Sequence, residues 1–271
     1  MKNIFKLSTA IILVLLFSCH PQRKVIKEDV SAFIPADSIG AIRMARPQDY
    51  ATKANANGKK KPPPVTTTTT PPPAGTQVVL NDTATIYVNF DGYTITTPAW
   101  IWAGPIVCAP ANLTQVEKDS IIKIIKTEYD TFNVRITTDS LIYNLTNPGR
   151  RQELVITETD TWQSSTHSTP GVSQLNSFGK EIPNFVFTIP LLYNPKYIGD
   201  AAAHEIGHSF NLYHQRNYDS AGNLLAEYKP GVVMGTFYNF AYGKWIIGPT
   251  LTYTTIQDDK KVISTITGYK H

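Results

Sequence analysis

The stretch AAAHEIGHSFNLYHQ, Ala201 to Gln215, decides the fold class and holds three of the six histidines in this 271-residue chain. His204 and His208 are four residues apart, so on a helix their imidazoles lie on one face, one turn apart. The preceding YIGDAAA suits a helix interior, because alanine has the highest helix propensity. Two imidazoles at this spacing can bind zinc, and Glu205 beside them can take a proton from water on that ion.

The third ligand depends on how the helix ends. His214 lies six residues after His208, and a continuous helix would turn its side chain away from the first pair. It reaches the same ion only when the helix stops near Asn211 and the chain bends back. Asparagine is, after glycine, the residue that best tolerates the left-handed conformation such a bend needs. The three ligands His204, His208 and His214, which would leave a fourth position for water, therefore depend on a left-handed Asn211.

A glutamate on a later helix is the alternative third ligand. Glu227 stands 19 residues after His208, the separation used by one large aminopeptidase family of the gluzincin class. The segment between them is rich in turn-forming residues: Asn217, Asp219, Gly222 and Asn223. Such a segment leaves little room for a supporting helix, and ligation by Glu227 would leave His214 without a role. These observations favour His214, with Glu227 kept as the alternative.

Further segments extend the similarity beyond the histidines. They are, in chain order, IYVNFDGY, FNVRITTD, NSFG, FVFT, HEIGHSFNLYH, VMGTFY and QDDKKVI, and they span nearly all of residues 84–266. Together they resemble exported bacterial metalloproteases of the metzincin class. Metzincins place a methionine in a tight turn after the third histidine, and GVVMGTFY puts Met234 twenty residues after His214. The chain departs from the pattern at Asn211, where glycine is usual, and at Thr236, where some members have tyrosine.

The resemblance implies a zinc endopeptidase that acts on protein or peptide substrates. Zinc would polarise the scissile carbonyl and lower the pKa of its bound water, while Glu205 serves as general base and then as acid toward the leaving amine. Tyr238 is a candidate for stabilising the oxyanion, although a packed aromatic explains it equally well. The strand Asn184 to Ile189 would be the sheet edge on which an extended peptide pairs.

Two other functions remain open. One is a surface binding module that keeps the fold and holds zinc structurally, with weak or no catalysis. The other is a gluzincin-type aminopeptidase that uses Glu227. Calcium is a further candidate ligand, although the spacing of Asp91, Asp200 and Asp219 does not require it.

The order of the elements predicts an α+β domain, a zincin or metzincin-like fold with a twisted mixed sheet. Thr114 and Glu117 have the spacing of a capping box, which predicts a helix that starts there. The histidines lie on a second helix, and residues 162–176 are expected to form a loop. A third, amphipathic helix is expected over Thr255 to Ile266. Strands are expected over residues 84–95, with a turn at Asp91-Gly92, and over 133–138, 153–159 and 184–189.

The N-terminus predicts export. Lys2 and Lys6 precede the apolar run Ala10 to Phe17, which is too short to span a bilayer. The following LFSC, ending in Cys19, resembles a bacterial lipoprotein signal over residues 1–18, in which the cysteine becomes acylated. A lipid at Cys19 would anchor a soluble domain to a membrane, facing the periplasm or the cell surface. An ordinary secretory signal is the other interpretation.

Composition divides the rest of the chain. Residues 19–76 are polar and include KKKPPPVTTTTTPPP, which predicts a disordered tether and leaves residues 77–271 for the catalytic domain. The net charge of +4 is mild and partly N-terminal, so it does not indicate nucleic-acid binding. The chain has two cysteines. A lipid on Cys19 would leave Cys108 without a disulfide partner, and we expect a buried thiol there and a monomeric protein.

Overall fold

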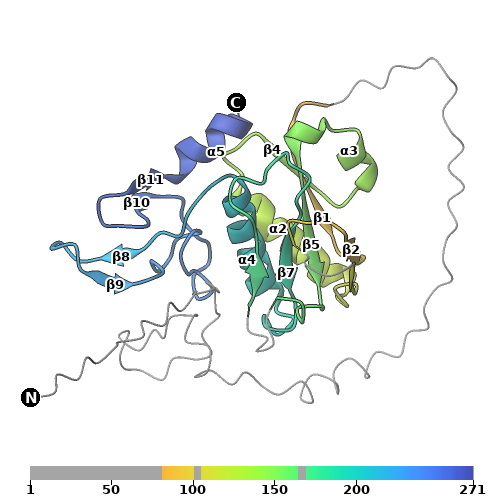
Figure 1. Cartoon of the computed structure of the whole chain (residues 1–271), viewed down its shortest axis with the longest axis horizontal. Coiled ribbons are helices and arrows are strands. Elements are labelled where there is room, and N and C mark those ends of the chain that lie inside the picture. Colours follow the sequence, from red (N-terminus) through yellow and green to blue (C-terminus); the bar gives the residue numbers. More distant parts are fainter. Residues whose placement is uncertain (1–80, 101–104, 164–168, 271) are drawn as a thin grey trace, which may run out of the picture.

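The computed structural model describes residues 81–100, 105–163 and 169–270 (Figure 1). The described part combines four α-helices with a mixed five-stranded sheet, an arrangement compatible with the expected α+β class. The predicted signal segment, the tether and Cys19 lie outside these residues. Within the described ranges, no helix combines the length and the apolar character needed to cross a membrane.

The main sheet has the strand order β4-β1-β5-β7-β6. Its first four members in this order pair in parallel, whereas β6 runs antiparallel to β7. The strands are β1 (Ala84–Asn89), β4 (Val134–Thr137), β5 (Arg151–Thr157), β6 (Gly171–Val172) and β7 (Asn184–Phe187). Each of the four strands predicted from the sequence is present, with the ends shifted by a few residues.

The prediction that residues 184–189 form the edge of the sheet is wrong. β7 lies between β5 and β6 and is buried along its whole length. The outer strand on this side, among the described residues, is β6 (Gly171–Val172), inside a stretch that the sequence predicted to be loop. A two-residue strand is too short to show the alternation by which strands are recognised, so only the folded chain reveals it.

Alternate residues of the strands face two separate cores. Leu154, Ile156 and Val186 face the larger core, formed with helices α2 and α4. Phe185 and Phe187 point to the opposite face, where the hairpin of β2 (Tyr93–Ile95) and β3 (Ile106–Cys108) contributes Ile95 and Cys108. The two-residue period of a strand explains this division. Cys108 is a buried free thiol, as predicted, and burial raises its pKa to about 11.

Helix α2 (Gln115–Glu128) begins with the predicted capping box, in which Thr114 and Glu117 each bond the backbone of the other. Its inward residues Ile121 and Ile125 are fully buried. The helix packs along α4 (Pro195–Ser209), which carries the histidines. The two helices lie close together at Gly199, where a β-carbon would lie 2.8 Å from Ile124, so a small residue is needed there.

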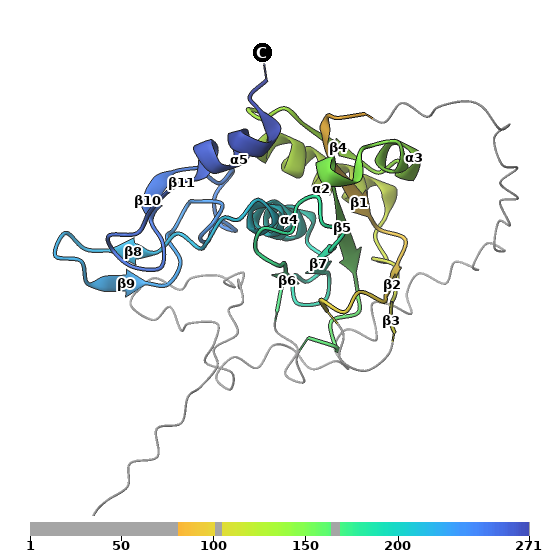
Figure 2. The ribbon, with the colours of Figure 1, turned by 45° about the horizontal axis from the view of Figure 1, so that its top comes forward.

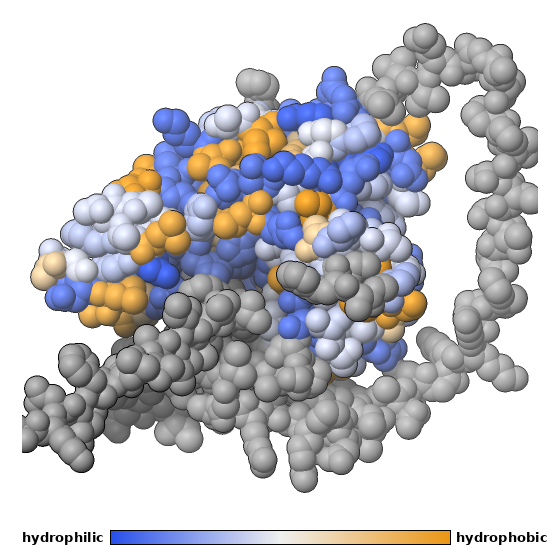
Figure 3. Space-filling view, viewed as in Figure 1, coloured by the Kyte–Doolittle hydropathy of each residue, from blue (hydrophilic) through white to orange (hydrophobic). Residues whose placement is uncertain are grey.

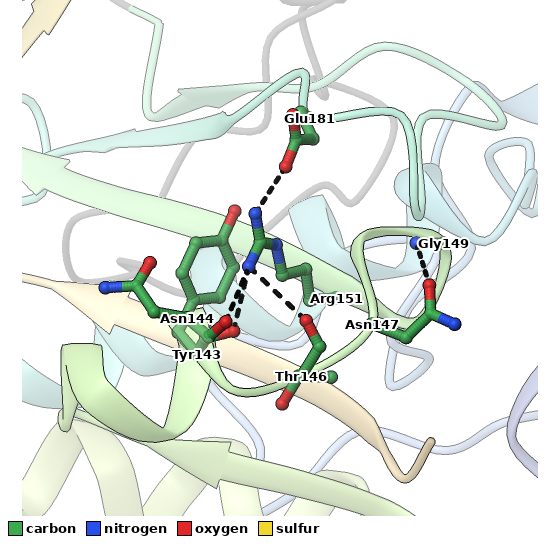
Figure 4. A network of polar contacts seen from close by, with 7 residues as sticks. All are labelled: Tyr143, Asn144, Thr146, Asn147, Gly149, Arg151 and Glu181. Carbon is green, nitrogen blue, oxygen red and sulfur yellow. Dashed lines mark hydrogen bonds and ion pairs between the residues drawn. The ribbon is translucent and has the colours of Figure 1, made fainter. Parts of the chain in front are cut away.

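The short helix α3 (Ser140–Asn144) and the 3-10 turn η2 (Pro148–Arg150) connect β4 to β5. Arg151, the first residue of β5, holds this connecting segment in place through its side chain (Figure 4). One guanidinium nitrogen donates to the carbonyls of Tyr143, Asn144 and Thr146 at 3.1–3.4 Å, and the other pairs with Glu181. A cation near the last carbonyls of a helix satisfies groups that would otherwise lack a partner.

The C-terminal part consists of two hairpins and a helix. They are β8 (Asn217–Tyr218) with β9 (Leu224–Ala226), β10 (Ile247–Pro249) with β11 (Ile256–Asp258), and α5 (Asp259–Thr267). The helix predicted from Thr255 therefore starts late, because Ile256 pairs with Pro249 in a strand and Asp258 caps the helix. Figure 2 looks along α4 and shows this helix between the main sheet and the two hairpins.

Apolar side chains on the face seen in Figure 3 form several separate areas between hydrophilic ones. The most exposed apolar side chains of the C-terminal hairpins are Leu225, Ile247 and Ile256. A few exposed apolar residues of this kind are usual on protein surfaces and do not define a docking surface.

Candidate metal centre

Two of the three histidines are positioned by α4 itself. Asn194 caps the start of the helix by accepting a hydrogen bond from the Lys196 amide, and Pro195 occupies the first turn. Ala201, Ala202 and Ala203 are buried, so this helix lies close against the sheet. The rings of His204 and His208 consequently lie on one face, with centroids 4.7 Å apart.

The end of α4 makes the predicted bend. Asn211 has a φ of 75°, in the left-handed region that a site with His214 requires. The Asn211 amide bonds the His208 carbonyl at 2.8 Å, and the Leu212 amide bonds the Gly207 carbonyl at 3.2 Å. This pair of bonds is the Schellman motif, which ends a helix and reverses the chain direction. The residues after Asn211 therefore return toward the histidine face.

The bend brings His214 to the helical pair. The Nε2 atoms of His208 and His214 are 3.0 Å apart, and one ligand atom from each of the three histidines lies within 4.8 Å of the others. A tetrahedral ion bound by nitrogens at about 2.1 Å separates its ligand atoms by roughly 3.4 Å. The three imidazoles thus lie close enough together to bind a metal ion.

Backbone carbonyls orient two of the rings. Nδ1 of His204 lies 2.6 Å from the Val233 carbonyl, and Nδ1 of His208 lies 2.7 Å from the Leu212 carbonyl. A carbonyl only accepts hydrogen bonds, so each Nδ1 carries the proton and Nε2 is the nitrogen whose lone pair can bind a metal.

The protonation state of the rings also suits a metal. Burial is the main cause that lowers the pKa of His204 to about 3 and that of His208 to about 4, and it holds the pKa of His214 well below its ordinary value. Neutral imidazole is the form that binds a metal. His204 is buried, whereas His208 and His214 are half-buried, so the cluster is reached from their side.

The turn around Met234 lies directly against the helical histidines. Met234 is fully buried, and its sulfur occupies the space that a β-carbon on Gly207 would take. The carbonyl of Val233 orients His204, and the carbonyl of Met234 accepts from the Gln215 amide at 2.6 Å. One turn therefore contacts both the helix and the segment that carries His214.

Glu205 lies between the histidines and the edge of the sheet. It precedes His208 by three residues, so their side chains are neighbours on the helix surface. A β-carbon on Gly171 in β6 would lie 2.7 Å from Oε1 of Glu205, which places the carboxylate against the edge strand. Burial raises the pKa of Glu205 to about 8, and the nearby Ser173 side chain offsets part of this rise.

Two other candidate site residues, Glu227 and Tyr238, have contacts outside the histidine cluster. The Glu227 carboxylate is paired with Arg216 at 2.5 Å and is not part of the three-histidine cluster. Tyr238 packs on Tyr197, near the start of α4, with ring centroids 5.5 Å apart, and belongs to the main core.

The proposed calcium ligands also have protein partners. Asp200 pairs with Lys196, and Asp91 lies 3.7 Å from the Lys118 ammonium. Asp219 accepts hydrogen bonds from the amides of Ala221 and Asn223 in its own hairpin. In the described part of the chain, the three histidines are the one group of His, Cys, Asp and Glu side chains placed to hold a metal.

Three residues near the histidines were not predicted. Tyr228 is buried and packs on His214, with ring centroids 4.8 Å apart. Gln215 and Asp259 are fully buried and hydrogen-bonded to each other. The only signal in the sequence was the position of Gln215 next to His214, since buried polar side chains outside a motif have no periodicity.

Comparison with known proteins adds no homologue to this picture. No family model matches the chain, and no curated protein shows significant similarity to it. A functional assignment therefore depends on the geometry of the site and on the motifs in the sequence.

Proposed function

We propose that the chain is a zinc-dependent endopeptidase of the metzincin type. The observation that carries this proposal is the convergence of three imidazoles beside the buried carboxylate of Glu205. Three histidines suit zinc, and three protein ligands leave the fourth tetrahedral position open, as in catalytic rather than structural sites.

Bound zinc would supply a Lewis acid that polarises a peptide carbonyl and makes water acidic at neutral pH. Glu205 would accept a proton from water and deliver it to the nitrogen of the leaving amine. The carbonyls of Val233 and Leu212 would keep two imidazoles in the orientation that the metal requires.

The substrate would bind along β6. An extended peptide adds to a sheet by pairing its backbone with an outer strand, and β6 is the outer strand beside Glu205. A peptide on this edge would run past the carboxylate and the half-buried side of the histidine cluster. This placement replaces the edge predicted at residues 184–189.

We further infer from the N-terminal sequence that the enzyme is exported and attached to a membrane through a lipid on Cys19. The expected result is that the full-length protein fractionates with membranes, whereas Cys19→Ser releases it into the soluble fraction. Membrane association of Cys19→Ser equal to that of the wild type would contradict the anchor.

Metal analysis and a peptidase assay test the catalytic proposal. The purified protein should contain about one zinc per chain. Its peptidase activity on casein or gelatin should be lost on chelation. Glu205→Gln should retain the zinc and lose the activity, whereas the exposed Glu181→Gln should keep both. Full activity of Glu205→Gln would refute the mechanism, and absence of activity in a zinc-loaded wild type would instead favour a binding module.

The same preparation separates the two candidate third ligands. His214→Ala should lose zinc, because the third imidazole in the cluster is removed. Glu227→Ala should keep zinc, because its carboxylate is paired with Arg216. The reverse pattern would indicate gluzincin-type ligation.

A further inference from the structure

The third ligand lies on a different kind of segment from the other two. His204 and His208 are held by the regular hydrogen bonds of α4, whereas residues 212–216 around His214 form neither helix nor strand. Regular backbone bonds therefore do not determine where the His214 ring points. Some other contacts must hold this segment in place.

One such contact comes from Gln257 at the C-terminal end of the chain. The Tyr213 amide donates to Oε1 of Gln257 at 2.9 Å, and Nε2 of Gln257 donates to the Tyr213 carbonyl at 3.1 Å. The side-chain amide thus binds both backbone groups of the residue that precedes His214. Two simultaneous bonds restrict the position and the orientation of the Tyr213 backbone, including the peptide group that leads into His214.

The residue after His214 is held from the same direction. Nε2 of Gln215 donates to Oδ1 of Asp259 at 2.9 Å, and Gln257 donates to the same oxygen at 2.9 Å. The second oxygen of Asp259 accepts from the Ile246 amide at 3.0 Å. Asp259 and Gln215 are both fully buried, so the group is shielded from competing water.

The opposite side of Gln215 is bound to the turn around Met234. The backbone N–H of Gln215 donates to the Met234 carbonyl at 2.6 Å, and the backbone carbonyl of Gln215 accepts from the Lys229 amide at 2.7 Å. The backbone on both sides of His214 is thus fixed, by the C-terminal segment on one side and by the turn on the other.

We propose that Gln215, Gln257 and Asp259 form a clamp that positions His214, so that metal affinity depends on the C-terminal segment Gln257–Asp259. The three residues act through the backbone of Tyr213 and Gln215 rather than by touching the metal. This inference rests on the proposed metal site. Partners that orient a metal ligand commonly change metal affinity by roughly 10- to 100-fold when removed.

Zinc affinity, measured by competition with a chromophoric chelator on the full-length protein, tests the clamp. Gln257→Met keeps the length of the side chain and removes both bonds to Tyr213, so zinc binding should weaken roughly 10- to 100-fold. Asp258→Ala is the matched control, because it removes the cap of α5 one residue away without touching the clamp. Unchanged affinity of Gln257→Met, or equal weakening in both variants, would overturn the proposal.

Hydrogen exchange of the metal-free protein separates the clamp from the metal site. Gln257→Met should speed the exchange of the amides at residues 213–216, whereas Asp258→Ala should speed exchange in α5. A wild type that binds no zinc would refute the proposed function, and the exchange comparison would still decide whether the clamp holds His214. If Gln257→Met does not fold, Gln257→Glu keeps an acceptor for the Tyr213 amide and removes the donor to its carbonyl.

Discussion

Asn211 determines whether His214 can join the two helical histidines. Its positive φ allows the amides of Asn211 and Leu212 to bond the last turn of α4 and the chain to reverse. The side chain of Asn211 is exposed, so its contribution is conformational and does not come from packing. Substitutions at this position therefore test the bend with little disturbance of the core.

Asn211→Gly should keep both stability and zinc affinity, because glycine adopts a positive φ without steric cost. Asn211→Val should lower the free energy of unfolding by about 1–2 kcal/mol, because a β-branched side chain does not tolerate the left-handed conformation that asparagine accepts. It should also weaken zinc binding, because the strain is relieved by moving His214. Urea unfolding and chelator competition check these outcomes, and equal behaviour of the two variants would contradict the role given to the bend.

At the scale of elements, the contact between β6 and α4 places Glu205. Gly171 allows the edge strand to pass so close that a β-carbon there would lie 2.7 Å from Oε1 of Glu205 and 2.9 Å from the Phe185 carbonyl. Neither the helix nor the strand alone determines where this carboxylate lies.

Gly171→Ala should therefore move the Glu205 carboxylate while leaving the histidines in place. Peptidase activity should fall on the order of 100-fold, the usual effect of a small displacement of a reacting group. Zinc content should stay at the wild-type level. Gly149→Ala is the control, because a β-carbon there meets nothing closer than 3.7 Å. Normal activity of Gly171→Ala would show that the carboxylate position does not depend on β6.

A second prediction at this scale concerns the connection between β4 and β5 (Figure 4). Arg151→Lys keeps the positive charge, but a lysine ammonium cannot bond three carbonyls and Glu181 together. The variant also loses the stacking of the guanidinium on Tyr143, in which Cζ lies 4.5 Å from the ring centroid. The free energy of unfolding should fall by about 1–3 kcal/mol. Chemical denaturation should detect this loss with zinc content unchanged, whereas a loss of zinc would show that the connection also supports the metal centre.

At the scale of the whole molecule, a buried acid joins two segments that are far apart in the chain. Glu128 is at the end of α2. Its side-chain carboxyl group accepts a hydrogen bond from the Gly243 amide at 2.9 Å, and its backbone carbonyl accepts one from the Trp245 indole at 2.7 Å. Glu128 thereby connects α2 with the segment that follows the Met234 turn. Burial raises the pKa of Glu128 to about 7 from its ordinary value of 4.5.

A raised pKa in the folded state means that the native protein holds a proton which the unfolded chain has released. The stabilisation from protonated Glu128 is therefore complete below about pH 4.5 and is lost as the pH rises through 7. Glu128→Gln, which retains an acceptor for Gly243, should be more stable than the wild type at pH 8 by about 2 kcal/mol. Urea unfolding at pH 5 and pH 8 measures the difference. The control is Asp119→Asn, an exposed acid on the same helix, and parallel pH profiles for wild type and Glu128→Gln would contradict the prediction.

The features that were predicted correctly have short-range causes. The capping box at Thr114, the buried stripe of α2 and the bend at Asn211 each depend on residues within one or two turns of each other. The errors occurred where distant segments decide. β6 is two residues long and exists because β7 lies beside it, and the start of α5 is delayed because Ile256 pairs with Pro249.

The sequence by itself determined the identity of the candidate ligands, since two histidines four residues apart on a helix and one after a left-handed residue follow from local geometry. Only the tertiary structure decided how those ligands are held. The Met234 turn, the edge strand at Gly171 and the bonds of Gln257 and Asp259 come from segments between about 20 and 50 residues away in the chain. Hydrogen bonds and close contacts between such segments carry no periodic signal, because they depend on where the folded chain places each backbone group.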